Sequence, residues 1–134
     1  PKNILVGPNG PVLLDAECAW YGDPAFDLAF CLNHLLLKAI PQPACGAGLR
    51  ASFDALAESY LARVDWEAAS ALEARAAALL PGLLLARCDG KSPVEYLTRE
   101  ADRERLRGVA RPLLLRPVGA LAEVASAWFA SAWR

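Results

Sequence analysis

The 134-residue sequence contains no methionine, only one histidine and no excess of charge of either sign. Lysine and arginine number 14 against 15 acidic residues, so the chain lacks the basic surplus that neutralises nucleic-acid phosphates. The four cysteines include no Cys-x-x-Cys pair, which argues against a closely spaced zinc site. We therefore predict no nucleic-acid partner, and buried free thiols in a reducing cytoplasm.

Long uninterrupted apolar runs are also missing. A membrane-spanning helix requires roughly 20 consecutive apolar residues, whereas the run Leu79–Ala86 is interrupted by Pro81 and Gly82. We therefore predict no membrane span. The absent methionine and the abrupt opening at Pro1 are typical of a piece of a longer protein. With 55% hydrophobic and 22% charged residues, the chain has the composition of a single folded domain rather than of a disordered chain.

The first residues have the pattern of a β-hairpin. The short apolar runs Asn3–Val6 and Val12–Leu14 flank a segment of glycine, proline and asparagine, which is a strong turn signal. A four-residue turn at 7–10 would place Asn3 opposite Leu14, whereas a two-residue turn at 9–10 would place it opposite Ala16.

In either register, Asp15 lies within about 7–8 Å of Asn3 at the open end of the hairpin. An amide oxygen and a carboxylate are hard ligands of the kind that Mg²⁺ prefers, and Mg²⁺ completes its shell with waters and phosphates. The hairpin therefore predicts a magnesium site at Asn3 and Asp15.

Everything after Gly22 has helical periodicity, so the predicted fold class is mainly α with an N-terminal β-hairpin (residues 1–17) and a helical subdomain (residues 23–134). Asp23 is expected to cap the first helix rather than to bind a ligand. Helices are predicted at 24 to about 40, at 49–64, at 99–115 and at 118–132. A further helix is predicted from an N-cap at Asp65 to about 83, with a kink or break at Pro81. A short helix is predicted to begin at the capping box Ser92–Glu95.

Three motifs at the start of the chain occur in a fixed order: Pro1–Leu5, Leu13–Glu17 and Gly22–Ala29. Together they resemble the aminoglycoside phosphotransferase and choline kinase superfamily, protein-kinase-like enzymes that phosphorylate hydroxyls of small molecules with ATP. The catalytic loop of that family reads H-G-D-x-x-x-x-N, close to that of protein kinases. The resemblance implies that Asn3 is the last residue of this loop and that Asp15 is the metal-binding Asp.

The resemblance also implies an architecture for the whole protein. The chain would be the C-terminal lobe of a protein-kinase-like fold, with Mg²⁺ and ATP as cofactors and a small hydroxyl compound as acceptor. The catalytic Asp would lie three residues before Pro1, and the nucleotide-binding lobe would precede it, so the chain alone is expected to be inactive. The acceptor stays open among an antibiotic, a sugar, choline and other metabolites.

The residues around the metal-binding Asp depart from the usual family pattern. The family often has I-D-W-E, whereas this chain has Leu14-Asp15-Ala16-Glu17, followed by an aromatic-rich segment that is partly similar to methylthioribose kinases. Glu17 is a candidate second metal ligand, with a solvated acid as the alternative. Trp20 and Tyr21 are candidates for stacking on the substrate, with core packing as the alternative.

Asp27 lies one turn into a helix that is apolar almost all round, where an unpaired carboxylate would be costly to bury. By the resemblance, Asp27 would support the catalytic loop by accepting hydrogen bonds from its backbone. A different class of function stays open for the whole chain: a non-catalytic helical binding domain, or a degenerate pseudokinase-like lobe.

Overall fold

The N-terminal hairpin opens the computed structural model, which describes residues 3–16, 19 and 21–131. Strands β1 (Ile4–Gly7) and β2 (Gly10–Leu13) pair antiparallel around a tight turn. Gly10 has a φ of 105°, a conformation that favours glycine. The amide of Leu14 donates to the carbonyl oxygen of Asn3 at 2.8 Å. The predicted hairpin is confirmed, and its register is the one in which Asn3 lies opposite Leu14.

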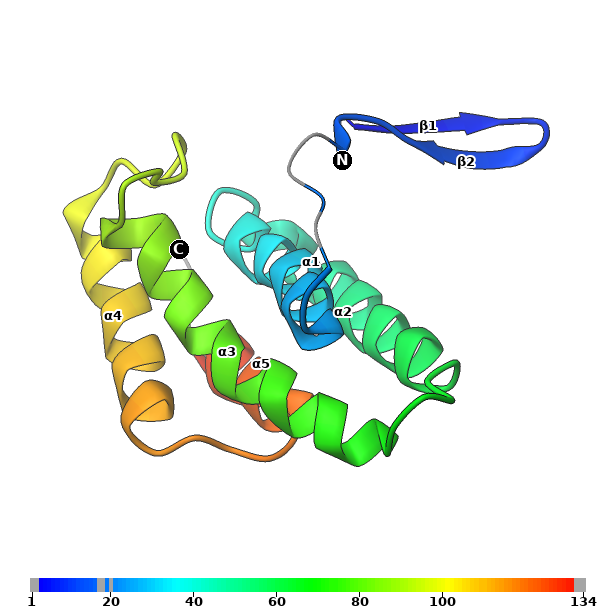
Figure 1. Ribbon diagram of the computed structural model, residues 1–134. Helices are drawn as coiled ribbons and strands as arrows, with labels where there is room; N and C mark the ends of the chain where they lie inside the picture. The colour runs from blue at the N-terminus through cyan, green and yellow to red at the C-terminus, as the bar shows by residue number, and fades with distance from the viewer. Residues whose placement is uncertain (1–2, 17–18, 20, 132–134) are drawn as a thin grey trace.

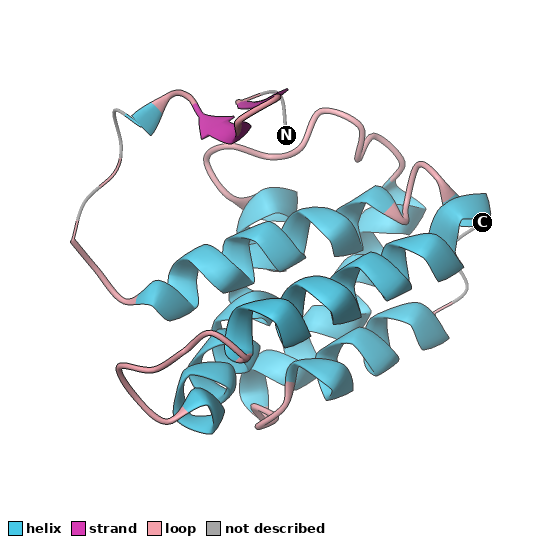
Figure 2. Cartoon of the chain, turned by 90° about the vertical axis from the view of Figure 1, so that its right-hand side faces the viewer, coloured by secondary structure: helices cyan, strands magenta, loops and turns pink. Residues whose placement is uncertain are grey.

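The rest of the chain is helical, as Figures 1 and 2 show. The fold class, mainly α with an N-terminal antiparallel hairpin, is therefore confirmed. The elements are α1 (Pro24–Lys38), the 3₁₀ helix η2 (Pro43–Cys45), α2 (Gly46–Leu61), α3 (Ala69–Asp89), α4 (Glu100–Leu115) and α5 (Leu121–Ala130). Helix α3 is central, because it packs against α1, α4 and α5, while α2 packs on α1 and α5.

Helix α1 begins as predicted, with Asp23 as its N-cap. The Asp23 side chain accepts a hydrogen bond from the amide of Ala25 at 3.0 Å. Arg75 of α3 donates to the same carboxylate at 2.9 Å and also bonds Glu67. The hydrogen bond from Arg75, followed by that from Ala25, lowers the pKa of Asp23. One aspartate therefore caps α1 and joins it to α3.

Two predicted helix caps, Asp65 and Ser92, are wrong, and the helices predicted to begin at 49 and 118 begin at Gly46 and Leu121. Helix α3 begins at Ala69 with Ala68 as N-cap, so Asp65 caps no helix, and α3 continues through a buried Pro81 without a break. The segment Ser92–Glu95 forms no helix.

The reason that Ser92–Glu95 is not helical lies in the end of α3. The Arg87 Nη1 donates to the carbonyl oxygen of Ser92 at 2.7 Å, and the amide of Val94 donates to the Arg87 carbonyl oxygen at 2.9 Å. Val94 and Leu97 are buried. These contacts hold the segment across the end of α3 in place of a capped helix.

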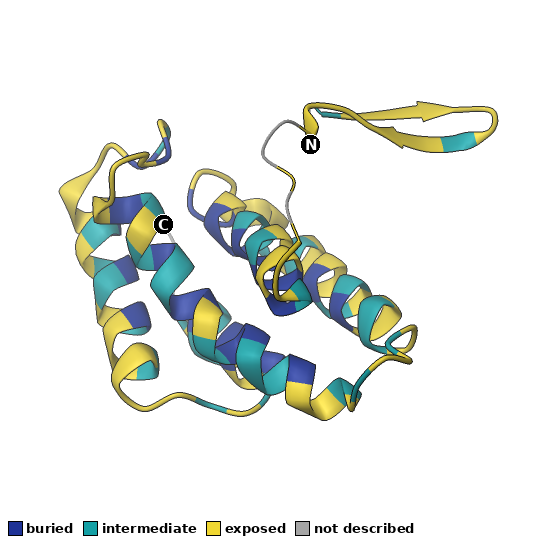
Figure 3. Ribbon diagram, in the orientation of Figure 1, coloured by how far each residue is buried: buried dark blue, intermediate teal, exposed yellow. Residues whose placement is uncertain are grey.

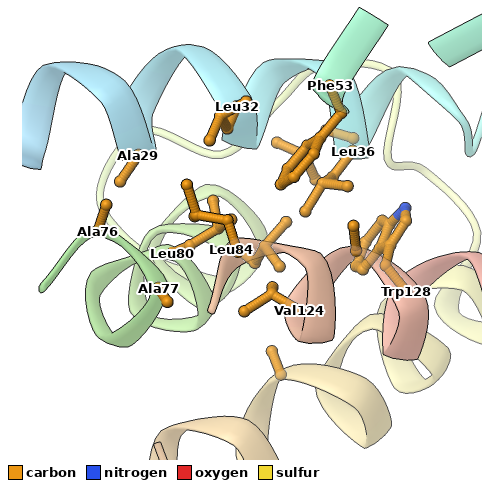
Figure 4. Packing of buried hydrophobic residues seen from close by; sticks show 14 of the residues in the cluster. Ala29, Leu32, Leu36, Phe53, Ala76, Ala77, Leu80, Leu84, Val124 and Trp128 are labelled. Carbon is orange, nitrogen blue, oxygen red and sulfur yellow. The ribbon is translucent and has the colours of Figure 1, made fainter. Parts of the chain in front are cut away.

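The hydrophobic core lies between the helices, and Figure 4 shows its centre. Leu32 and Leu36 of α1 pack with Phe53 of α2, the leucines of α3 and Trp128 of α5. Helix α5 is also tied to α3 at its start, because the Glu73 carboxylate accepts a hydrogen bond from the amide of Leu121 at 3.0 Å.

Helix α3 is long and apolar enough to cross a membrane by length and composition alone. The core helix of a soluble protein passes the same test. Here the helix packs against three others, and its buried residues include Leu72, Leu80 and Leu84.

The hairpin, in contrast, buries little, and Figure 3 shows it exposed along nearly its whole length. Its apolar side chains are exposed on both faces; Val6 is 84% exposed on one face and Val12 is 55% exposed on the other. An isolated two-stranded hairpin is marginal in water. The helices therefore provide the stable part of the described chain.

The expectation that the cysteines are buried thiols is only partly correct. Cys88 is buried, whereas Cys31 and Cys45 are exposed, and all three are free. Cys18 lies outside the described residues.

Asn33 is a polar residue in the core, fully buried on α1, and neither side-chain polar atom has a partner among the described residues. Replacing both unpaired groups by an apolar side chain of similar size should remove their desolvation cost. We expect Asn33→Leu to raise the free energy of unfolding by about 1–3 kcal/mol in urea denaturation. The control, Asn33→Asp, buries a charge and should destabilise the protein; destabilisation by both variants would contradict the unpaired state.

Arg107 joins α4 to the end of α3. It donates to both oxygens of Asp89, at 3.0 and 2.6 Å, and also bonds Glu100 and Glu104. The hydrogen bond from Arg107 lowers the pKa of Asp89 from an ordinary 3.8 to about 2. Because the folded state holds this carboxyl ionised, the pair stabilises the protein above pH 4 and loses that effect as the pH falls toward 2.

We therefore expect the stability difference between the native protein and Asp89→Asn to shrink as the pH falls. Chemical denaturation at about pH 5 and about pH 2.5 measures it. A difference that is the same at both values would show that the ion pair contributes nothing.

Candidate functional site

The open end of the hairpin brings together the two residues that the sequence paired. The Asn3 Nδ2 donates to the Asp15 Oδ2 at 2.6 Å. The pairing of Asn3 with Leu14 sets this position, because Asp15 is the next residue after the ladder ends. The predicted proximity of Asn3 and Asp15 is present in the structure.

Asp15 has an unusual backbone conformation, with a φ of 62°. Among the described residues other than glycine, it alone has a positive φ. Aspartate tolerates this region better than most residues, but the conformation still costs roughly 1–3 kcal/mol. Such strain concentrates at functional sites, and here it turns the carboxylate toward Asn3.

The chemistry of this pair fits Mg²⁺. Rotation of the Asn3 amide exchanges Nδ2 for Oδ1, which gives one amide oxygen and one carboxylate as ligands. Two protein ligands suffice for Mg²⁺, which takes its remaining ligands from waters and phosphates. Within the described part of the chain, no group of three His, Cys, Asp or Glu side chains forms a metal cluster. Two ligands of this kind would suit an Mg²⁺ ion bound together with a phosphate compound, rather than a closed metal centre.

The structure gives less support to the other site residues that the sequence predicted. Glu17 and Trp20 lie outside the described residues. Tyr21 is completely exposed, so its alternative as a core residue is wrong, while its role in substrate binding stays a prediction. The expectation that α1 is buried over most of its circumference is also wrong, because Phe26, Asp27 and Cys31 are exposed. The role of Asp27 in supporting the catalytic loop stays a prediction. Helix α1 buries one side against α2 and α3 and leaves the Asp27 side open.

The open side of α1 carries an aromatic stripe that sequence reasoning missed. Phe26 is 46% exposed and stacks on Phe30 with ring centroids 5.7 Å apart. Phe30 meets His34 edge to face at 4.9 Å. The signal was the spacing of four residues between successive rings, which places them on one helix face. The stripe is an aromatic surface on the same side of α1 as Asp27.

Comparison with known proteins adds no family to this description: no protein-family model, curated protein or solved structure matches the chain.

Proposed function

We propose that this chain is the C-terminal lobe of a cytoplasmic ATP-dependent phosphotransferase that acts on a hydroxyl of a small molecule. The single observation that carries the proposal is the Asn3–Asp15 pair at 2.6 Å. In phosphoryl transfer, positioning and charge neutralisation do most of the work, and Mg²⁺ on the phosphates supplies the neutralisation. Asn3 and Asp15 would hold that ion, and a catalytic Asp expected upstream of Pro1 would accept the proton of the acceptor hydroxyl.

Two further features support the proposal. The strained backbone of Asp15 turns its carboxylate to Asn3 at the hairpin end that lies toward the helices (Figure 1). The uncovered apolar hairpin suits a lobe that packs against a nucleotide-binding lobe.

The acceptor would bind on the helical part, and the aromatic stripe of α1 is the best candidate for its surface. Phe26 and Phe30 offer ring faces to an apolar or ring-shaped acceptor, and the exposed Asp27 lies beside them. Asp27 would then either support the catalytic loop, as the resemblance implies, or contact the acceptor.

The experiment that tests the proposal measures transfer of the ATP γ-phosphate to a panel of hydroxyl-bearing metabolites. It uses the longest natural protein that contains this chain, with Mg²⁺ and then with EDTA. Mg²⁺-dependent formation of a phosphorylated acceptor supports the proposal. No transfer and no ATP binding by that protein, with no H-G-D ending three residues before Pro1, would favour a non-catalytic binding domain instead.

A further inference from the structure

A second candidate site lies at the other end of α1 from the Asp23 cap. There, the last turns of α1, the end of α3 and the segment after α3 line an open cavity of about 520 Å³ at the surface. This volume is within the range of small-molecule sites, roughly 300–1,000 Å³. The polar side chains that line the cavity are His34, Lys38, Arg87, Ser92, Glu95 and Tyr96.

The charge of this cavity is positive. Lys38 and Arg87 carry positive charges at neutral pH, and Glu95, which is exposed, is the single carboxylate among the described residues that line the cavity. Burial, and then the charge of Arg87, lowers the pKa of His34. The imidazole is therefore neutral at pH 7 and adds a hydrogen-bonding group rather than a charge.

The two cations are held in place by different contacts. The Lys38 ammonium lies 4.6 Å from the centroid of the Tyr96 ring, which is a cation–π contact. Arg87 is half-buried, and its Nη1 bonds the carbonyl oxygen of Ser92 at 2.7 Å. Both cations are therefore positioned at the wall of the cavity before any ligand arrives, which lowers the entropy cost of binding.

Two hydrogen-bond donors of the lining residues lie behind this wall, closed to solvent. Within the described residues, the Arg87 Nε and the Tyr96 hydroxyl are buried without a partner. Because neither atom is open to solvent, an acceptor in the cavity would reach them only after the side chains of the wall move. An oxyanion supplies several acceptors and the negative charge that Lys38 and Arg87 favour.

We propose that this cavity binds a small molecule through an oxyanion group, either a phosphate or a carboxylate, held by Lys38 and Arg87. The site is separate from the Asn3–Asp15 pair and does not depend on the phosphotransferase function. Arg87 contributes the positive charge of a guanidinium whose Nη1 already bonds Ser92, while Lys38 contributes a point charge at the exposed rim.

The test is an NMR titration of the ¹⁵N-labelled chain at low ionic strength, with sodium pyrophosphate in one arm and sodium citrate in the other. We expect saturable shifts of the amides of Lys38, Ser92 and Tyr96 in at least one arm, and that arm identifies the phosphate or the carboxylate as the ligand group. Lys38→Gln should weaken the binding by about tenfold or more, because one charge-assisted contact is lost. Lys38 is exposed, so this variant should stay folded.

The matched control is Lys91→Gln, which removes the same charge from an exposed lysine in the segment after α3 that does not line the cavity. It should change the affinity for the anion by less than about twofold, because a charge that does not contact the ligand contributes only a long-range attraction that salt screens. The proposal is overturned if neither anion gives saturable shifts, or if the two lysine variants weaken binding equally.

Discussion

Asp15→Asn should abolish Mg²⁺-dependent phosphoryl transfer in the natural protein that contains this chain. The substitution keeps the shape of the side chain and removes the charge that would hold the cation at the phosphates. Asparagine also tolerates the left-handed backbone at this position, so the fold should be preserved. We expect the rate to fall by at least about 10²–10³-fold, the size of effect seen when one group that stabilises transition-state charge is removed.

The control for this variant is Asp65→Asn, which removes an exposed aspartate that caps no helix. It should leave the rate of transfer within about twofold of the native value, since surface substitutions rarely matter. If Asp15→Asn retains full activity, Asp15 holds no catalytic metal.

A second readout tests the metal site without any catalysis. Mn²⁺ should broaden the NMR signals of Asn3, Leu14 and Asp15 in this chain, because a paramagnetic ion relaxes nearby nuclei. Asp15→Asn should remove that selective broadening while the helical signals stay unchanged. Broadening that persists in the variant would place the ion elsewhere.

Phe53→Ala should destabilise the helical part of the protein by about 3–5 kcal/mol, the usual cost of truncating a buried phenylalanine. Phe53 is fully buried and packs from α2 against Leu36 of α1, as Figure 4 shows. A loss of this size is a large fraction of the roughly 5–15 kcal/mol that stabilises a typical domain. Urea denaturation followed by far-ultraviolet circular dichroism measures the loss.

Leu115→Ala is the control for this core variant. Leu115 is 82% exposed at the end of α4, so its truncation should change the free energy of unfolding by no more than about 0.5 kcal/mol. Equal losses in the two variants would mean that the helices are packed differently from the arrangement described.

The hairpin shows which structural features a local sequence pattern can predict and which it cannot. The turn residues and the alternation of apolar runs predicted both strands and the closeness of Asn3 and Asp15. The choice between the two registers needed the structure, because both turns are compatible with the same glycines and prolines. The positive φ of Asp15 was not visible in the sequence, because aspartate is common in ordinary turns as well.

The sequence predicted the presence of the long helices better than the residues at which helices begin and end. Asp23 was recognised as an N-cap because its signal is local: a capping residue followed by proline. Ser92 is also followed by proline, and Asp65 is a capping type of residue, yet neither caps a helix. At Ser92, tertiary contacts decide the outcome, since Arg87 takes its carbonyl oxygen and Val94 is buried.

The exposed site residues were the least predictable. Composition alone suggested that α1 is buried almost all round, yet Phe26 and Asp27 are exposed, because its neighbours α2 and α3 cover only one side. The Lys38–Arg87 cavity joins residues from α1 and α3 that are far apart in the chain. The spacing of residues along the sequence does not predict that these distant residues lie close together.

The amino-acid sequence alone determined the mainly helical fold class, the hairpin and the pairing of Asn3 with Asp15, because each depends on residues close together in the chain. The tertiary structure decided the register, the exposed face of α1 and the cationic cavity. The register depends on which turn closes the hairpin. The exposed face of α1 and the cavity depend on which helix faces meet, and the free energy of burying one face rather than another comes from the whole core and not from any local pattern.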